Sequence, residues 1–312
     1  MNWMCRSNYR ARTHVRHTAG HTEMTLKTHS LWFSMPVIIR AVIGGILIGM
    51  IAANVWPILL LKLGMPTAAV VELVFLGLYA WWAAGGGPPS RSKGIRADYF
   101  RVHSLSGSQW LWGVVAAVAF AASIHAAMVL LFRFVPFPAA AFHSGYDFSF
   151  IGSRQMQWLA CVVSALSASV CEETGFRGYM QRPIENRHGP AVAILISSLA
   201  FMVIHLTKDW ALIGMVPIVF GAGVLLGTLA RASGTLIFGM FGHWIMDIGL
   251  FAYWWTQIAG IFTQRPISEA GMDGAFYIEC AVFVISVSLM LVATARLREL
   301  RLARTACDGG VR

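Results

Sequence analysis

Two adjacent glutamates at the end of an apolar run are the residues of this chain best suited to chemistry. Glu172 and Glu173 follow the stretch 158–170, and Arg177 stands four residues after the second glutamate. Because residues four apart share one helical face, Glu173 and Arg177 can pair, whereas Glu172 lies about 100° round the helix without that partner. A carboxylate in apolar surroundings with no fixed cation is suited to act as a general base. A salt bridge at a helix end is the competing interpretation of this motif.

Two further pairs of chemically useful side chains fall inside later apolar stretches. Phe201 and His205 are four residues apart, so an aromatic ring and an imidazole share one helical face. His243 and Asp247 have the same spacing, which lets Asp247 accept a hydrogen bond from one ring nitrogen and fix the tautomer of His243. Taken singly, each histidine is also consistent with a buried, hydrogen-bonded structural residue. Together with the glutamates they supply a base, a proton donor and oxyanion donors, the groups that peptide hydrolysis needs.

Zinc binding is the alternative use of the same side chains. His205, His243 and a carboxylate are a common zinc ligand set. The chain contains no HExxH sequence, and no GxSxG sequence that would indicate a serine nucleophile. Its five cysteines form no CxxC pair and predict neither a disulfide framework nor a zinc knuckle. The residue types alone leave metal-free and zinc-dependent hydrolysis open.

The elements that must position these side chains are membrane helices. The 312 residues are 57% hydrophobic and 12% charged, whereas soluble domains are about 25% charged. Most of the long apolar stretches can cross a bilayer as a helix. The eight stretches are 37–61, 67–84, 109–132, 155–182, 190–207, 210–230, 234–258 and 276–296. We therefore predict an all-α polytopic membrane protein with about eight transmembrane helices.

The distribution of Lys and Arg indicates the orientation of these helices. Of the 24 basic residues, 19 fall in the N-terminal segment, the loops after the second, fourth and sixth stretches, and the C-terminal tail. The positive-inside rule then places both termini in the cytoplasm. The net charge of +10 is accordingly a feature of membrane topology, and we expect the lipid bilayer as a partner and no nucleic acid.

Polarity divides the chain into three parts. Residues 1–35 are polar and basic with four histidines, which predicts a disordered tail in preference to a metal-binding segment. No short apolar stretch with a cleavage site stands there, so we do not expect a secretory signal. Residues 36–297 are expected to form one helical membrane domain with its core motifs at 172–247, and 298–312 a basic C-terminal tail. Three ionisable residues inside the stretches are expected only to pack or hydrogen-bond between helices: Glu72, His125 and Glu279.

Helix geometry allows the candidate side chains to meet at one depth. At a rise of about 1.5 Å per residue, Glu172 lies about 15 Å from the end of a helix that finishes near Arg182. His205 lies about 24 Å, and His243 about 15 Å, from the expected start of its own helix. These depths fall in the middle to outer part of a hydrocarbon core about 30 Å thick. Such a meeting requires the fourth helix to continue through the glutamates as far as Pro183.

The ordered set of motifs resembles the CAAX protease and bacteriocin-processing family of glutamate-type intramembrane endopeptidases, which includes the type II CAAX prenyl endopeptidases. The motifs are Glu172-Glu173-x-x-x-Arg177, Phe201-x-x-x-His205 and His243-x-x-x-Asp247, in the family's order and on separate stretches. The family's eight-helix architecture would account for the whole hydrophobic portion of the chain. The resemblance also favours catalysis without a metal or other cofactor.

The resemblance implies a role for each motif residue. Glu172 activates the attacking water with help from His205, and His243 and residue 247 stabilise the oxyanion, while Glu173, Arg177 and Phe201 support them. Position 247 is typically Asn in the prenyl endopeptidases, although Asp occurs in the wider family. Ionised Asp247 cannot donate to an oxyanion, so it either orients His243 or works in its protonated form.

The sequence therefore predicts a prokaryotic inner-membrane endopeptidase that cuts a peptide or a membrane-anchored protein substrate. Two alternatives belong to other functional classes. One is a non-catalytic immunity protein of the same fold that binds a peptide, and the intact set of acid, base and oxyanion candidates counts against it. The other is a proton-coupled transporter with a relay of Glu, His and Asp. The lack of inverted repeats in the sequence counts against the transporter.

Overall fold

The computed structural model describes residues 32, 34–145, 147–206, 214–254 and 265–309. The chain divides into two compact units, Met1–Pro36 and Val37–Arg312, and the helices α2 to α14 all belong to the second unit. Most of the predicted N-terminal tail, 1–35, lies outside the described residues. Within them every regular element is a helix and none is a strand, which confirms the all-α prediction.

The helices follow the apolar stretches of the sequence closely. They are α2 (Val37–Ala53), α3 (Val55–Leu63), α4 (Thr67–Ala83), η1 (Ser90–Ser92), α5 (Lys93–Tyr99), α6 (Gly107–Phe134), α7 (Ala139–Gly145), α8 (Arg154–Glu173), η2 (Thr174–Met180), α9 (Gln181–His188), α10 (Pro190–His205), α11 (Met215–Ser233), α12 (Ile237–Trp254), α13 (Ile267–Ala270) and α14 (Gly274–Gly309). The described part of each of the eight stretches is mostly helical; the non-helical residues inside them are Asn54, Ala84, Leu206, Gly214 and 234–236.

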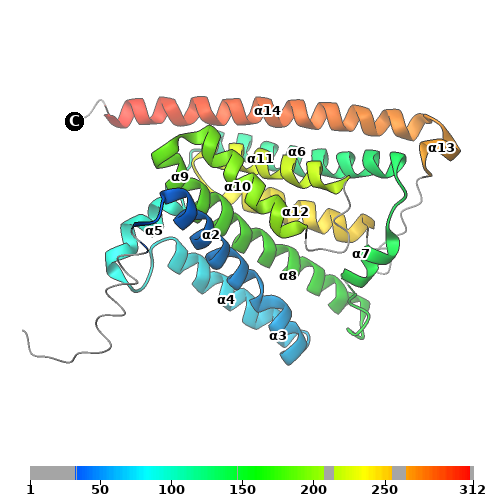
Figure 1. Ribbon diagram of the computed structural model, residues 1–312, viewed down its shortest axis with the longest axis horizontal. Helices are drawn as coiled ribbons and strands as arrows, with labels where there is room; N and C mark the ends of the chain where they lie inside the picture. The colour runs from blue at the N-terminus through cyan, green and yellow to red at the C-terminus, as the bar shows by residue number, and fades with distance from the viewer. Residues whose placement is uncertain (1–31, 33, 146, 207–213, 255–264, 310–312) are drawn as a thin grey trace, which may run out of the picture. The chain divides into compact units, whose positions relative to one another are not determined.

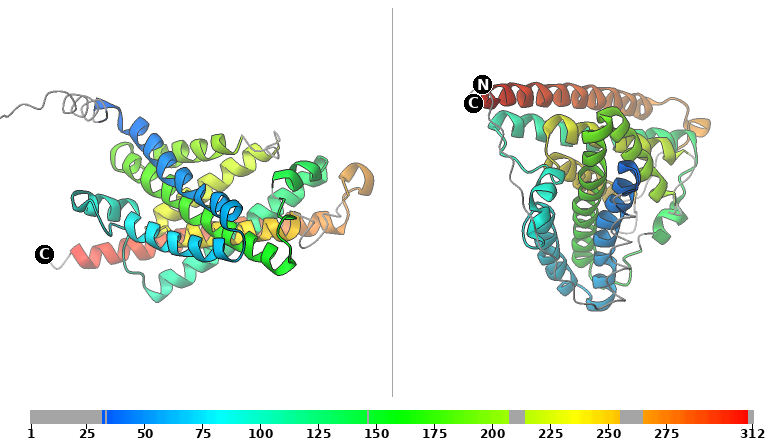
Figure 2. Two further views of the ribbon diagram at one scale, coloured as in Figure 1. Left: turned by 90° about the horizontal axis from the view of Figure 1, so that it is seen from below. Right: turned by 60° about the vertical axis from the view of Figure 1, so that its left-hand side comes forward.

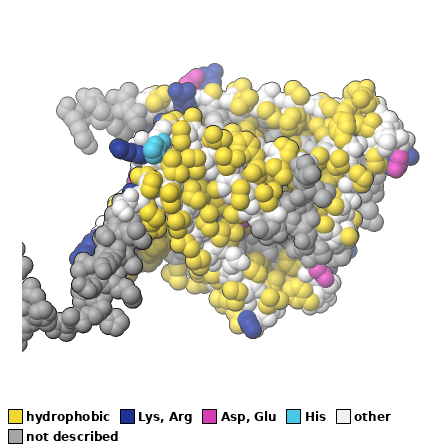
Figure 3. Space-filling model, viewed as in Figure 1, with side chains coloured by type: hydrophobic (Ala, Val, Ile, Leu, Met, Phe, Trp, Pro, Cys, Tyr) yellow, Lys and Arg dark blue, Asp and Glu magenta, His cyan; other side chains and the backbone are white. Residues whose placement is uncertain are grey.

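Five helical segments are long and apolar enough to cross a bilayer: Val37–Leu63, Gly107–Phe134, Arg154–His188, Met215–Ser233 and Gly274–Arg304. Three shorter apolar helices accompany them: Thr67–Ala83, Pro190–His205 and Ile237–Ala252. The face of the second unit seen in Figure 3 is predominantly hydrophobic, with Lys and Arg side chains toward its edge. Eight membrane crossings and cytoplasmic termini both stay predictions.

Helix α8 lies in the middle of the bundle and carries the paired glutamates at its end. It packs against α2 and α4 on one side and against α12 on the other (Figure 1). Helix α6 packs on α12, and α14 runs along α6, as both views in Figure 2 also show. Helix α10 packs against α11. Helix α8 is therefore a direct neighbour of α12, whereas α10 contacts η2, the continuation of α8.

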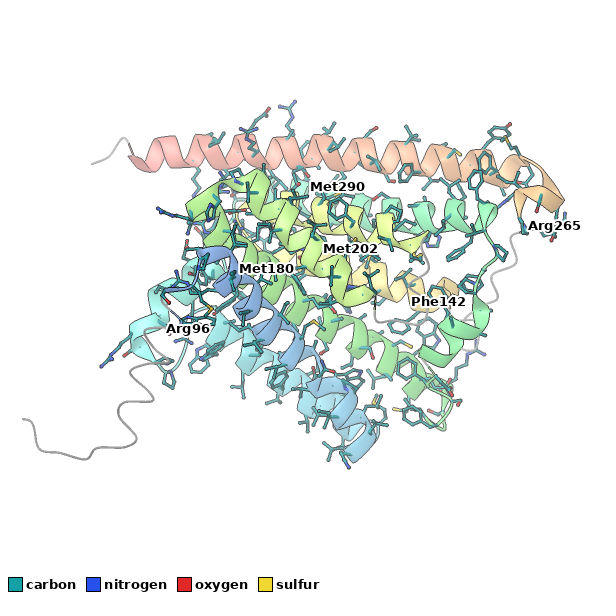
Figure 4. The ribbon with its side chains drawn as sticks, in the orientation of Figure 1. Arg96, Phe142, Met180, Met202, Arg265 and Met290 are labelled. Atoms are coloured by element: carbon teal, nitrogen blue, oxygen red, sulfur yellow. The ribbon has the colours of Figure 1, made fainter. Side chains whose placement is uncertain are left out.

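Segments rich in Gly and Pro mark two of the helix boundaries. Helix α4 ends just before the segment 85–89, and α10 begins at Pro190, immediately after Gly189. The first break is closed by Arg96, a buried side chain labelled in Figure 4. Its guanidinium donates to the carbonyl groups of Trp82, Gly86, Gly87 and Pro89 at 2.7 to 3.3 Å.

The fourth helical segment does continue to Pro183, but part of it is a π-helix. Helix α8 ends at Glu173, the next seven residues form the π-helix η2, and α9 carries the chain past Pro183. The apolar stretch 155–182 predicted one helix and did not indicate this π-helical part. A π-turn has a wider backbone loop than an α-turn and is frequent at functional sites.

Close backbone contact with α2 fixes the position of this π-helix. A Cβ atom on Gly175 would lie 2.6 Å from the carbonyl oxygen of Gly45 and 2.7 Å from Cα of Gly49. Gly45 and Gly49 are four residues apart on α2, the small-residue spacing that lets two membrane helices approach closely. Met180, labelled in Figure 4, closes the same contact, because a Cβ on Gly45 would lie 2.6 Å from its Cβ.

Candidate active site

Glu173 lies at the centre of a buried network of charged side chains. Its Oε1 atom is 3.1 Å from Nη1 of Arg177 and 3.1 Å from Nδ1 of His243. The Glu173 side chain is 1% exposed and that of Arg177 is fully buried. The ion pair predicted from the spacing of Glu173 and Arg177 is therefore present, and one carboxylate oxygen serves both the arginine and the histidine.

The ring of Phe201 packs against residues of all three motifs. The guanidinium carbon of Arg177 lies 4.4 Å from the centre of the Phe201 ring, within cation–π distance. On the same ring, His205 packs at a centroid distance of 4.5 Å and His243 packs edge-on at 6.1 Å. One aromatic side chain from α10 thus contacts a residue of each motif.

His243 presents its two ring nitrogens to different carboxylates. Nδ1 faces Glu173, and because an ionised carboxylate only accepts, Nδ1 donates the hydrogen bond there. Nε2 lies 3.6 Å from Oδ2 of Asp247 and 3.9 Å from Oε2 of Glu172. Both distances exceed a hydrogen bond. The side chain that orients His243 is therefore Glu173, whereas the i, i+4 spacing had suggested Asp247 for this role.

Glu172 differs from its neighbour in that no described arginine or lysine pairs with it. Among the described residues, no group forms a hydrogen bond with its buried Oε2 atom. His243 lies within 4 Å of this oxygen, but Arg177 pairs with Glu173 instead. The contrast between the two glutamates therefore follows the one predicted from helical spacing.

His205 has one ring nitrogen committed within its own helix. Nδ1 lies 2.7 Å from the carbonyl oxygen of Phe201, one turn earlier in α10. A carbonyl oxygen accepts, so Nδ1 carries the proton. In the neutral tautomer this places the lone pair on Nε2, which can then accept a hydrogen bond from water.

A cavity of about 550 Å³ joins these side chains, and Glu172, His205, His243 and Asp247 all line it. Phe201 also contributes to its wall, whereas Glu173 and Arg177 lie behind that wall. Most of the remaining lining is apolar and comes from helices on every side, including Trp56, Met128, Phe142, Met215 and Phe251. The four motif residues, separated by up to 75 positions in the chain, thus meet at one mostly apolar cavity of the size typical for ligand sites.

The comparison with protein families agrees with this arrangement. Residues 154–249 match the family described as Type II CAAX prenyl endopeptidase Rce1-like. The chain carries an Rce1-like domain. No curated protein and no solved structure matches the chain. The Rce1-like domain begins at the first residue of α8 and ends within α12, so it contains all three motifs. The apolar helices and this family together indicate a membrane protein with a CAAX-type endopeptidase fold.

The zinc alternative depends on whether three ligand side chains converge. Within the described part of the Rce1-like domain and its surroundings, no group of three or more His, Cys, Asp and Glu side chains is arranged to hold a metal ion. His205 turns Nδ1 toward its own helix, and His243 turns Nδ1 toward Glu173. A zinc ion in the cavity would therefore have to bind the two rings through Nε2.

The contact between His243 and Glu173 is the feature of the Rce1-like domain that sequence reasoning missed. A weak signal for it stands one helical turn before His243. Gly239 shares that face of α12, and a Cβ atom there would lie 3.1 Å from Oε2 of Glu173. A small residue four positions before a histidine therefore marked the place where α8 approaches α12.

The other buried glutamate behaves as a structural residue, as its isolation in the sequence predicted. Glu72 on α4 is fully buried, and Ser167 on α8 donates a hydrogen bond of 2.7 Å to its Oε1. Ser167 itself lines the cavity, whereas Glu72 does not. This bond ties α4 to α8 in an apolar environment, where such interhelical hydrogen bonds contribute about 0.6 to 2 kcal/mol.

Proposed function

We propose that this chain is an intramembrane glutamate-type endopeptidase that hydrolyses a peptide bond of a membrane-associated protein or peptide. The observation that carries the proposal is the mostly apolar cavity that Glu172, His205 and His243 line together. Acid–base groups gathered at an apolar cavity favour chemistry over packing, because each costs free energy to bury. The family match supports the same class of reaction.

Glu172 is the proposed general base. Its Oε2 atom makes no hydrogen bond among the described residues and its side chain, 12% exposed, lines the cavity. It takes a proton from water as the water oxygen attacks the carbonyl carbon of the substrate, and later gives that proton to the leaving amine. His205 holds the water through Nε2, because its Nδ1 is bound to the Phe201 carbonyl.

His243 is the proposed oxyanion donor. With Nδ1–H bound to Glu173, the imidazolium form of His243 directs Nε2–H toward the cavity. A donor held in this way stabilises the negative oxygen of the tetrahedral intermediate without reorganising during the reaction. Arg177 contributes by fixing the position of Glu173 from behind, outside the cavity.

Asp247 is proposed to act in its protonated form. Its Oδ2 atom is 3.6 Å from Nε2 of His243, close enough to compete with an oxyanion for that donor if it were ionised. A protonated Asp247 donates to the oxyanion instead. The two remaining carboxylates, Glu172 and Glu173, are then matched by Arg177 and the imidazolium of His243, so the buried site carries no net charge.

Cleavage of defined peptides by the purified protein tests the proposal. The full chain is reconstituted into vesicles with a library of membrane-anchored peptides, each prepared with and without a prenyl group, and products are identified by mass spectrometry. We expect cleavage at internal peptide bonds by the wild-type protein and none by Glu172→Gln. Products formed equally by both proteins would overturn the proposal, and tight peptide binding without cleavage would favour the non-catalytic alternative.

A further inference from the structure

The candidate active-site cavity extends from the middle of the bundle toward one end of it. On α8, which the chain continues through η2 and α9, the cavity lining runs from Glu172 back to Ser164. The segment between α6 and α8 contributes residues that include Asp147 and Phe150. The other helices contribute their parts toward the same end: 56–61 on α3, 124–128 on α6, 215–222 on α11 and 243–251 on α12.

The segments at this end of the bundle carry few basic residues. Of the 24 Lys and Arg residues, five fall in them: Lys62, Arg133, Arg154, Lys208 and Arg265. The other 19 fall in segments that the positive-inside rule assigns to the cytoplasm, among them α5 and α9, which lie at the far end of the second unit (Figure 1). The same rule therefore predicts that the cavity lies toward the extracytoplasmic side of the membrane.

A polar segment connects this end of the cavity with water. Asp147 and Phe150 lie outside the helices that are long enough to cross a bilayer, and both are exposed. Hydrogen bonds from Ser149, one of them from its backbone N–H at 2.8 Å, hold the pKa of Asp147 below its ordinary value. Its carboxylate is therefore ionised at neutral pH, and an exposed, ionised carboxylate requires water around it. The cavity thus opens to the aqueous phase at the end where Asp147 lies.

The opposite direction is blocked by closely packed residues. All seven residues of η2, which follows Glu173, are buried, and Gly175 packs directly on the backbone of α2. Farther along, Arg101 from the loop after α5 pairs with Glu185 on α9 at 3.0 Å. No residue of η2 or α9, both of which the structure describes in full, lines the cavity. The π-helix therefore separates the cavity from the end of the bundle where α5 and α9 lie.

We propose that the substrate enters this cavity from the extracytoplasmic side, and that the protein cleaves exported peptides or the extracytoplasmic segments of membrane-anchored proteins. This inference rests on the proposed endopeptidase function and narrows its substrate class. Ser164 and Glu172 lie eight residues apart on α8, about 12 Å along its axis. An extended chain covers that length in about four residues. The substrate must therefore present an extended segment of at least about four residues to reach Glu172 from outside.

Labelling of introduced cysteines in bacterial cells that express the protein tests the side of entry without depending on catalysis. When the three other native cysteines are replaced by Ser, Cys161 and Cys171 remain, and both are fully buried. Ala168→Cys then adds a thiol to the cavity wall, one helical turn before Glu172. We expect a small membrane-impermeant methanethiosulfonate to modify this thiol at least tenfold faster from outside intact cells than in inside-out vesicles.

Two matched positions report the orientation of the protein in the same experiment. Phe150→Cys places an exposed thiol beside Asp147 at the mouth of the cavity and should react from outside. His188→Cys places an exposed thiol at the end of α9 and should react only in inside-out vesicles. Phe150→Cys that reacts only in inside-out vesicles would reverse the topology and overturn the proposal. Ala168→Cys that reacts only there, or from neither side in folded protein, would overturn it as well, because the cavity would not open to the outer phase.

Cleavage by oriented vesicles tests the substrate class. The probe is a water-soluble peptide that the detergent-solubilised protein cleaves, added to right-side-out or inside-out vesicles. We expect at least tenfold faster cleavage by right-side-out vesicles, and equal rates once detergent opens both kinds. Faster cleavage by intact inside-out vesicles would overturn extracytoplasmic entry while upholding the hydrolysis. A solubilised protein that cleaves no peptide would contradict the proposed function instead, and the cysteine labelling would still decide the side of entry.

Discussion

His243 Nδ1 lies 3.1 Å from Glu173 Oε1, although the two residues are 70 positions apart in the chain. Because the same oxygen is 3.1 Å from Arg177, the orientation of the imidazole depends on a buried ion pair. The two adjacent glutamates therefore lie in different environments. Glu173 contacts the buried side chains of Arg177 and His243, and Glu172 lines the cavity.

Replacing Glu172 with Gln should abolish proteolysis while leaving the fold intact. The substitution keeps the shape of the side chain but removes the base, so we expect the cleavage rate to fall by roughly 10²–10⁴-fold with an unchanged melting temperature. His205→Ala should behave similarly, and the double variant should be little worse than either single one. Glu72→Gln is the matched control, a buried glutamate outside the cavity. Wild-type cleavage by well-folded Glu172→Gln would contradict the mechanism.

Removing Glu173 should instead damage the fold. Glu173→Ala leaves Arg177 fully buried without its counter-ion, and breaking a buried pair in this way costs roughly 3–5 kcal/mol. We expect a lower melting temperature and a lower yield of folded protein in detergent. A double variant that also carries Arg177→Met should recover part of this stability without recovering activity, because His243 still lacks its partner. Equal stability of the two variants would argue against the ion pair as the cause.

The close contact between α2 and the π-helix should be sensitive to a single methyl group. Gly175→Ala places a Cβ atom 2.6 Å from the carbonyl oxygen of Gly45, and overpacking of this kind costs about 1–3 kcal/mol. Because η2 follows Glu173 directly, cleavage should fall together with the melting temperature. Gly44→Ala is the control on α2, since its Cβ meets no described atom within 4 Å. Similar melting temperatures for both variants would contradict the prediction that this contact leaves no room for a methyl group.

The zinc alternative makes a prediction opposite to that of the glutamate mechanism. If Glu172 activates water without a metal, the purified protein should contain substoichiometric metal and keep its activity in strong chelators. Elemental analysis and cleavage assays with and without chelator measure both quantities. Stoichiometric zinc that is lost together with activity, and restores it when added back, would make His205 and His243 metal ligands.

Asp273, which lies outside the apolar segments and pairs with Arg133, should make stability depend on pH in the acid range. A hydrogen bond from Arg133, and a second from the Phe276 backbone N–H, hold the pKa of Asp273 below its ordinary value. Ionised Asp273 therefore stabilises the folded state. This stabilisation is fully present above the unfolded pKa of about 3.9 and is lost as the pH falls through the lower pKa of the folded state. Asp273 is 40% exposed, so solvent screening keeps the effect small. Thermal melts of the wild type and Asp273→Asn between pH 2 and 6 should converge at the acid end. Parallel curves would contradict this assignment.

The sequence was sufficient for what depends on local spacing and composition. Hydropathy located the helices, the i, i+4 rule paired Glu173 with Arg177, and Gly189 with Pro190 marked the start of α10. The contacts of Glu173 with His243, and of Arg177 with Phe201, join separate helices and depend on how these pack. The π-helix after Glu173 was equally hidden, because it packs closely against Gly45 and Gly49 of another helix.

The charges around the candidate active site also bear on which end of a substrate can enter it. Asp147, Glu172 and Asp247 line the cavity, and no Lys or Arg occurs among the described residues of its wall. The guanidinium of Arg177 lies against the ring of Phe201 and does not line the cavity. Under the proposed charge assignment, the imidazolium of His243 is already balanced by the glutamates, so a free C-terminal carboxylate of a substrate would find no further counter-ion in the wall. An uncharged internal segment needs none, so the proposed hydrolysis should favour a cut within a chain over trimming from its C-terminus.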